Sequence, residues 1–181
     1  MLYKEIQLKN GQTCILRQPQ EDDAQNILDY LNYVCSETDF LTFGHGEMNF
    51  TLEEEKKYIN DHLELDNKIL IIAEVNRTIV GMSGFTGGKT KRIFHIGEFG
   101  ISVSREYWNL GIGRALIENV IEWAKQSGVI YKIELRVRVD NKLAIKLYKD
   151  VGFIREGTIS RQFFIGDIFY DAYIMGLNID N

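Results

Sequence analysis

The sequence contains little proline and little cysteine, and it has no excess of positive charge. One proline stands beside sixteen glycines in 181 residues, so the loops are built from residues with a wide choice of backbone angles. The two cysteines, Cys14 and Cys35, form neither a CxxC pair nor a disulfide framework, and we expect them to be structural thiols. The formal net charge of -5 argues against nucleic acid as a partner.

Long apolar stretches are also missing. No run approaches the roughly 20 residues that cross a bilayer, and the first residues lack the apolar core of a secretory signal. We therefore expect no membrane partner and a cytoplasmic location. The residues that are present, 45% hydrophobic and 26% charged, have the balance of a folded globular protein. Because there is no linker and no repeat, residues 1–181 are predicted to form one domain.

Strand and helix patterns follow one another in an order typical of a mixed α+β protein. Thr51 and Glu54 match a capping box at the start of a helix, and Asp140 or Asn141 caps a shorter one. Hairpin turns are predicted at 76–77 and 166–167. Neither a doubly wound parallel sheet nor a barrel has this order. The predicted strands lie at 12–17, 69–75, 78–85, 93–103, 131–139, 153–159, 162–165 and 168–177, and the predicted helices at 20–34, 52–65, 111–127 and 142–151.

Two glycines mark a predicted anion site. Gly111 and Gly113 lie where a strand ending at Val103 has passed through a loop and a helix begins. Glycine lets backbone N–H groups approach a ligand, and the first turn of a helix offers unpaired donors to a pyrophosphate. Leu116 occupies the position where a dinucleotide-binding fingerprint needs Gly or Ala, and no Walker A sequence occurs. A structural strand-to-helix turn is the alternative interpretation.

A second group of polar residues follows about thirty residues later. Asn141 and Tyr148 are seven residues apart, which is two helical turns, so they are predicted to share one side of a helix. Together with the glycine-rich helix start, they indicate a site for an extended phosphorylated ligand. Alone, Tyr148 is more typical of a core tyrosine, and only the two motifs together favour the ligand site. The three histidines, His45, His62 and His95, show no metal-ligand spacing, and no metal is expected.

These two motifs resemble those of the GCN5-related N-acetyltransferase (GNAT) family. The family's Gln/Arg-x-x-Gly-x-Gly/Ala motif is matched by Gly111 and Gly113, with Trp108 in place of Gln or Arg. Its N-x-x-A-I-x-L-Y-x-x-x-G-F motif is matched in full between Asn141 and Phe153. The resemblance implies a GNAT fold, with a mixed, mostly antiparallel sheet of about seven strands flanked by about four helices. It also implies acetyl-CoA as the acyl donor.

The resemblance also implies a role for individual residues. Tyr148 is expected to be the general acid and Glu98 the general base, directly or through water, although Glu98 could equally form an ion pair between strands. Some relatives place the base where this chain has Arg136. The expected cofactor-binding residues are Ile101, Ser102 and Val103 for the pantetheine amides, Leu110, Gly111, Ile112, Gly113, Arg114 and Ala115 for the pyrophosphate, and Asn141, Ala144 and Tyr148 near the thioester.

Acceptor binding is expected at the segment between the first two helices and at the terminal hairpin. We assign Phe40, Phe43 and Glu47 of the first and Tyr170 of the second, with a solvated Glu47 and core or dimer aromatics as alternatives. The acceptor is predicted to be a primary amine of a small molecule, with an amino acid favoured, or a peptide N-terminus. A polyamine acetyltransferase, a non-catalytic acyl-CoA-binding module and a homodimer that pairs through the terminal hairpin stay open.

Overall fold

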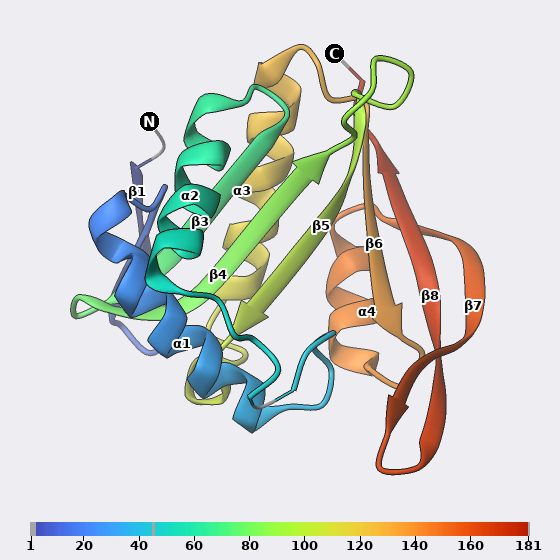
Figure 1. Cartoon of the computed structure of the whole chain (residues 1–181), viewed down its shortest axis with the longest axis horizontal. Coiled ribbons are helices and arrows are strands. Elements are labelled where there is room, and N and C mark those ends of the chain that lie inside the picture. Colours follow the sequence, from blue (N-terminus) through green and yellow to red (C-terminus); the bar gives the residue numbers. More distant parts are fainter. Residues whose placement is uncertain (1–2, 45, 181) are drawn as a thin grey trace.

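The computed structural model describes residues 3–44 and 46–180, and within them eight strands form one sheet. The strand order is β1-β2-β3-β4-β5-β6-β8-β7, and only the β5–β6 pair is parallel (Figure 1). The strands are β1 (Tyr3–Gln7), β2 (Thr13–Arg17), β3 (Lys68–Val75), β4 (Thr78–Gly87), β5 (Ile96–Val103), β6 (Lys132–Arg138), β7 (Ile154–Ile165) and β8 (Ile168–Asn178). The helices are α1 (Ala24–Glu37), α2 (Leu52–Glu64), α3 (Ile112–Ser127) and α4 (Lys142–Asp150), with short 3-10 helices η1 (Glu21–Asp23) and η2 (Arg105–Tyr107).

Helices cover both faces of the sheet, and this explains why the central strand β3 is apolar without interruption from Ile69 to Ala73. On β3, Leu70 and Ile72 pack with α1 and α2, whereas Ile69 and Ile71 pack with α3 and α4 on the other face. Successive side chains of a strand point to opposite faces, so a strand with both faces buried has no polar alternation. The sheet therefore separates two apolar cores.

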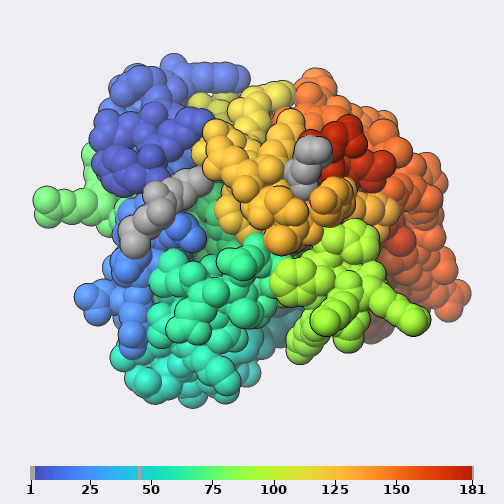
Figure 2. All heavy atoms as spheres, turned by 90° about the horizontal axis from the view of Figure 1, so that it is seen from above, coloured from blue at the N-terminus to red at the C-terminus, as the bar shows by residue number. Residues whose placement is uncertain are grey.

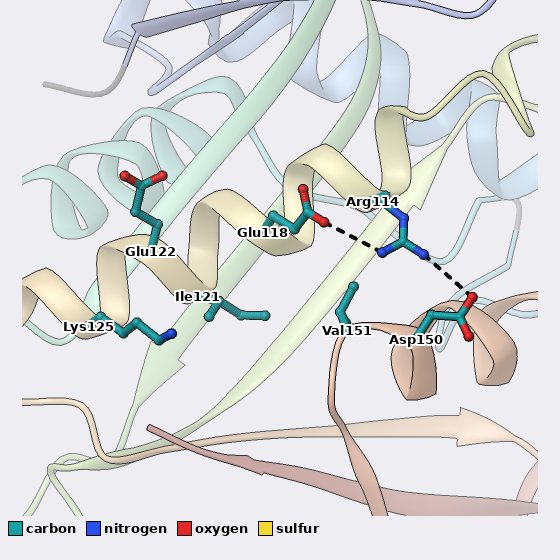
Figure 3. A pocket seen from close by; sticks show the side chains of 7 residues that line it. All are labelled: Arg114, Glu118, Ile121, Glu122, Lys125, Asp150 and Val151. Atoms are coloured by element: carbon teal, nitrogen blue, oxygen red, sulfur yellow. Dashed lines mark hydrogen bonds and ion pairs between the residues drawn. The ribbon is translucent and has the colours of Figure 1, made fainter. Parts of the chain in front are cut away.

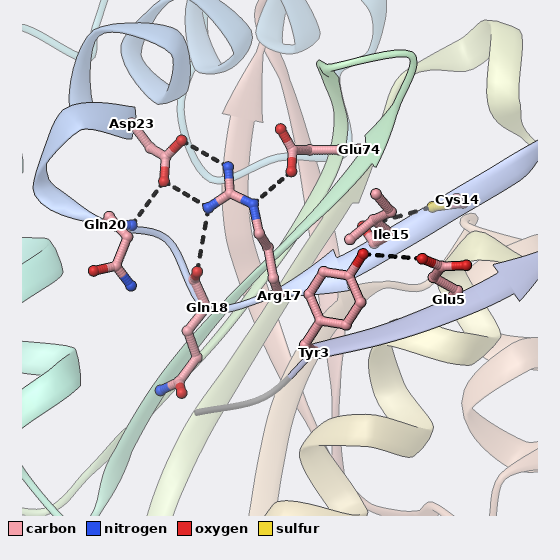
Figure 4. A network of polar contacts seen from close by, with 9 residues as sticks. All are labelled: Tyr3, Glu5, Cys14, Ile15, Arg17, Gln18, Gln20, Asp23 and Glu74. Carbon is pink, nitrogen blue, oxygen red and sulfur yellow. Dashed lines mark hydrogen bonds and ion pairs between the residues drawn. The ribbon is translucent and has the colours of Figure 1, made fainter.

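An ion-pair network fixes the start of α1 against the sheet (Figure 4). The guanidinium of Arg17 on β2 binds Asp23 through two N–H groups, at 2.7 and 2.8 Å, and Glu74 on β3 at 2.5 Å. These contacts raise the pKa of Arg17 and lower that of Asp23. Because Asp23 immediately precedes α1, the network sets where this helix lies on the sheet.

Most local signals read from the sequence are confirmed. Thr51 and Glu54 form the capping box of α2, and Gly128 ends α3 in a left-handed conformation. The turn at Asn76–Arg77 has positive φ angles of 51° and 65°, as a two-residue hairpin turn requires. The mixed α+β fold is confirmed as well, with eight strands where about seven were expected.

Three features differ from the sequence-based expectations. The first strand, β1, was not predicted, because most of its side chains are exposed. The strand expected from Ile93 begins at Ile96, because residues 90–95 form turns. The segments 153–159 and 162–165 form one strand, β7, whose register against β8 shifts at two irregular positions. Such bulges interrupt the side-chain alternation on which a sequence-based assignment depends.

The pairing between β5 and β6 stops partway along the two strands. Only Ile96, Gly97 and Glu98 of β5 have partners on β6, and the last pair is Glu98 with Glu134. Beyond it the strands diverge, and α4 lies behind them (Figure 1). At the paired end, the connection 88–95 lies between α2 and the C-terminal strands (Figure 2). Among residues 3–44 and 46–180, the rest of β5 through Val103 therefore has no strand partner on its β6 side.

Candidate functional site

The start of α3 presents backbone donors without acceptors. The first hydrogen bond of this helix runs from the Ala115 N–H to the Gly111 carbonyl at 3.1 Å. The N–H groups of residues 112–114 have no hydrogen-bond acceptor within the described ranges 3–44 and 46–180. No acidic residue lies in the first turn and no side chain caps it. Unpaired amides and the positive end of the helix dipole make this place suited to an anion.

The two glycines of this turn are required for different structural reasons. Gly111 has a φ of 105°, a conformation that L side chains rarely adopt, and a Cβ there would meet nothing within 4 Å. A Cβ on Gly113 would lie 3.3 Å from Leu147 Cδ2 of α4. Gly111 therefore allows the sharp entry into α3, while Gly113 permits close packing between α3 and α4.

Trp108, which departs from the family motif, holds the loop before α3. Its indole N–H donates to the Val103 carbonyl at 2.6 Å. The Arg105 guanidinium lies over its ring, 5.6 Å from the centroid. The side chain thus ties this loop to the end of β5, so the substitution leaves the turn into α3 well anchored.

The side chain of Arg114 lies away from the open amides, in a groove between α3 and α4 (Figure 3). Its guanidinium nitrogens are 3.5 Å from Glu118 and 3.5 Å from Asp150. The groove has a volume of about 340 Å³ and is lined also by Lys125 and Val151. Arg114 thus has a backbone donor at the helix start and a cation in the neighbouring groove.

The residues predicted to contact pantetheine lie on the part of β5 that lacks a β6 partner. Ile101 and Val103 pack against the core on the α3 side of the sheet. Ser102 points to the opposite face, where its Oγ is 2.9 Å from the Tyr30 hydroxyl of α1. Helices on both faces therefore hold this part of β5 in place.

The amide and the phenol predicted to share one side of α4 have distinct environments. Asn141 is the N-cap, because its Oδ1 accepts from the Ala144 N–H at 3.2 Å. Tyr148 is 7% exposed, and its ring lies 5.9 Å from that of Phe153. Burial raises the pKa of Tyr148, and its hydroxyl has no hydrogen-bond partner among the residues described. The phenol therefore stays protonated at neutral pH.

Glu98 lies at the point where β5 and β6 separate. Its carboxylate is 3.4 Å from the Arg136 guanidinium of β6, and both side chains are about half exposed. The ion pair weighed as an alternative in the sequence is therefore present. Along β5, Glu98 is on the same face as Ser102, which is the face covered by α1.

Two of the predicted acceptor residues come together around a residue to which the sequence analysis gave no role. The guanidinium of Arg138 lies between the rings of Phe40 and Tyr170, 4.4 and 4.2 Å from their centroids. Asp140 binds it through two hydrogen bonds of 2.7 and 2.9 Å. Arg138 lies within the strand predicted at 131–139.

The other two predicted acceptor residues lie elsewhere. Phe43 packs against the core that α1 and α2 share with the sheet. Glu47 is exposed, and its carboxylate accepts from the Gly44 N–H at 2.8 Å, which shapes its own loop. Neither contacts Arg138, Phe40 or Tyr170 through a polar or cation–π interaction within the described part of the chain.

Glu55 of α2 is a further buried group that the sequence did not reveal. The residue is 3% exposed, and its Oε1 has no hydrogen-bond partner in the parts of the chain that the structure describes. Burial raises the pKa of this carboxyl to about 6. Only the packing of α2 shows that this carboxyl is buried.

The side chains of the types that bind metals are dispersed over residues 3–44 and 46–180. There, no three His, Cys, Asp or Glu side chains are grouped so that they could hold a metal ion. His62 is buried, with Nδ1 at 2.7 Å from the Tyr58 carbonyl and Nε2 at 3.2 Å from Thr86 Oγ1. No helix in these ranges is long and apolar enough to cross a membrane.

Comparison with known proteins gives consistent matches. The model of the acetyltransferase (GNAT) family matches residues 36–153. L-amino acid N-acetyltransferase AaaT of Escherichia coli is 34% identical over 58% of this chain and 65% of its own length. The [ribosomal protein bS18]-alanine N-acetyltransferase of E. coli is 30% identical over 76% of this chain and 82% of its own length. The crystal structure of a GNAT-family acetyltransferase from Streptococcus pneumoniae superimposes with a TM-score of 0.90 at 35% identity, covering 92% of this chain and 99% of that one.

Proposed function

The chain belongs to the acetyltransferase (GNAT) family, and from this premise we propose that it moves an acetyl group from acetyl-CoA directly to a primary amine. The favoured acceptor is the α-amine of an amino acid or of a peptide N-terminus. One observation carries the proposal: the open edge of β5 leads to the unpaired amides of α3. An extended ligand with amides at one end and a pyrophosphate at the other matches these two features.

The residues present fit acetyl-CoA, the acyl donor of the family. The amides of Ile112, Gly113 and Arg114 would hold the pyrophosphate, and Gly111 leaves the space beside them free of a Cβ. The backbone of residues 101–103 would bind the pantetheine amides as a strand would. The thioester of acetyl-CoA supplies an activated acetyl group. Leu110 and Ala115 flank the turn, while Asn141 and Ala144 begin α4.

Tyr148 would donate a hydrogen bond, and then a proton, to the departing thiolate. A phenol can do so only while it is protonated, and burial raises its pKa. Its free hydroxyl is available because no described residue accepts from it. Positioned acids of this kind contribute typically about 100-fold or more to a rate.

Glu98 would accept the proton of the amine, directly or through a water molecule. It is half exposed, and it lies where β5 and β6 part. The Arg136 guanidinium lies 3.4 Å from the carboxylate and would orient it. No cysteine is needed, because transfer is direct.

The choice of an α-amine follows from the free energy of deprotonation. An α-amine with a pKa near 8 is about one-tenth neutral at pH 7, whereas a lysine-like amine near 10.4 is neutral about once in 2,500 molecules. The difference is roughly 3 kcal/mol. A half-exposed base suits the α-amine better. The names of the two curated relatives, an amino-acid and a ribosomal-protein alanine acetyltransferase, support the same preference.

The test is release of free CoA thiol with a matched set of acceptors. The set contains L-amino acids, the same amino acids with a blocked α-amine, a peptide with N-terminal alanine, and spermidine. We expect the highest kcat/KM for free α-amines and background rates for the blocked ones. A higher kcat/KM for spermidine than for the α-amines would show that the acceptor is a polyamine. Background rates with every acceptor would favour a non-catalytic acyl-CoA-binding module.

We also propose a homodimer through the terminal hairpin of β7 and β8. Phe164, Ile168 and Phe169 at its tip are each more than half exposed, and the two phenyl rings lie 4.7 Å apart. An exposed apolar tip of this kind favours association. Light scattering of the purified protein would show a dimer mass, and a monomer mass at all accessible concentrations would contradict it.

A further inference from the structure

Arg138 is buried at the end of β6, where three other segments of the chain meet. Its side chain is 8% exposed. Nη1 donates to the Asp39 carbonyl at 3.1 Å, and the neighbouring Phe40 ring lies against the guanidinium. Tyr170 of β8 covers the other side, and Asp140 at the start of α4 binds Nε and Nη2. The contact with Asp39 joins residues 99 positions apart in the sequence.

The position of Arg138 relates it to the proposed acceptor site. It follows Arg136 by two residues on β6, so the two side chains lie on one face of the sheet. Arg136 binds the proposed base, Glu98. Both lie in the part of β6 that β5 has left unpaired. The Arg138 cluster, which we define as Asp39, Phe40, Arg138, Asp140 and Tyr170, therefore lies on the face of the sheet from which an acceptor would reach Glu98.

The chemistry of the cluster favours one fixed arrangement. A guanidinium is planar, and it can bind a carboxylate along one edge while aromatic rings stack on its two faces. Lysine has no such plane and would keep only part of these contacts. Asp140 balances the charge, so the buried cation is paired. Arg138 thus fixes Phe40, in the connection between α1 and α2, relative to Tyr170 on the terminal hairpin.

We propose that Arg138 is a positioning residue that determines which acceptor amines the site accepts. It does so by holding Asp39 and Phe40 against Tyr170, which sets the wall of the acceptor side without a contact to the reacting atoms. The expected effect on acceptor KM rests on the proposed function. The claim that Arg138 holds Asp39 and Phe40 against Tyr170 does not depend on enzymatic activity. Acetyl-CoA lies on other elements and should be bound independently of Arg138.

The kinetic test compares Arg138→Lys and Arg138→Gln with Arg17→Lys. The control also removes a guanidinium bound by two N–H groups to an aspartate, but at the start of α1. For the Arg138 variants we expect the acceptor KM to rise about tenfold or more, the acetyl-CoA KM to stay within about twofold, and lysine to retain more function than glutamine. The control should lower the melting temperature without changing the acceptor KM. Equal changes in both KM values, or none, would overturn the inference.

A second readout needs no enzymatic activity. Hydrogen exchange of the amides in residues 38–44 should be faster in Arg138→Lys than in the wild type, and unchanged in Arg17→Lys. If the Arg138 variants do not fold, Phe40→Leu and Tyr170→Leu remove the two rings, and each should speed the same amides. Unchanged exchange in folded variants would overturn the positioning role. A wild type that acetylates no amine would instead refute the proposed function, while the exchange result would still decide whether Arg138 fixes this segment.

Discussion

Replacing Glu55 by glutamine should stabilise the protein, and only at a pH where the carboxyl would be ionised. Glu55 is 3% exposed, and its Oε1 lacks a hydrogen-bond partner among the described residues. Burial disfavours the charged form and raises the pKa from 4.5 to about 6. Glutamine keeps the shape of the side chain and carries no charge at any pH.

The sign and size follow from the two pKa values. A carboxyl whose pKa is higher in the folded state contributes no penalty well below pH 4.5, where both states are protonated. The penalty grows as the pH rises through 6 and then stays constant at about 2 kcal/mol. At pH 8, the free energy of unfolding of Glu55→Gln should therefore exceed that of the wild type by up to this amount. At pH 4 the two proteins should be nearly equal.

Urea unfolding of both proteins at pH 4 and pH 8 measures this difference, because every other titrating group is common to them. Glu53→Gln on the same helix is the matched control, since its side chain is 81% exposed. This control should change the free energy of unfolding by about 0.5 kcal/mol or less. A Glu55→Gln protein that is less stable than the wild type at pH 8 would show that the carboxylate has a stabilising partner. A stability difference of the same size at both pH values would show that it does not arise from ionisation of Glu55.

Three substitutions test the proposed acetyl-CoA site and its chemistry. Tyr148→Phe should lower kcat by about 100-fold with little change in acetyl-CoA Kd; an unchanged kcat would mean that water protonates the thiolate. Gly111→Val forces a φ of 105° on a branched residue, with strain of about 1–3 kcal/mol, so calorimetry should show acetyl-CoA affinity lowered tenfold or more. Full affinity in this variant would contradict the role of the turn. Trp108→Phe removes the bond to the Val103 carbonyl and should reduce the free energy of unfolding by about 1 kcal/mol, measured by urea unfolding. No change would show that the loop is held by other contacts.

Local structure could be predicted from the sequence because its signals involve neighbouring residues. The capping box of Thr51 and Glu54, the turn at Asn76–Arg77 and the end of α3 at Gly128 each depend on a few consecutive positions. The separation of β5 from β6 depends instead on where β8 and α4 lie, and no local pattern indicates it. The first strand was missed for a related reason, since β1 is an edge strand with little burial.

The candidate site was predicted in the same uneven way. The glycine of the α3 turn and the buried Tyr148 lie in contiguous motifs, so their positions followed from spacing. Asp140 is only two residues from Arg138, but Asp39, Phe40 and Tyr170 meet it only through the tertiary fold. For Glu47, the sequence left an acceptor ligand and a solvated loop residue as alternatives, and its carboxylate accepts from the Gly44 N–H of its own loop.

A crystal structure with acetyl-CoA bound would test the central claim most directly. We expect the phosphate oxygens within hydrogen-bond distance of the amides of Ile112, Gly113 and Arg114. The pantetheine should lie along residues 101–103, in the part of β5 that lacks a β6 partner. Acetyl-CoA found instead only in the outer groove between α3 and α4, with those three amides still free, would contradict this account.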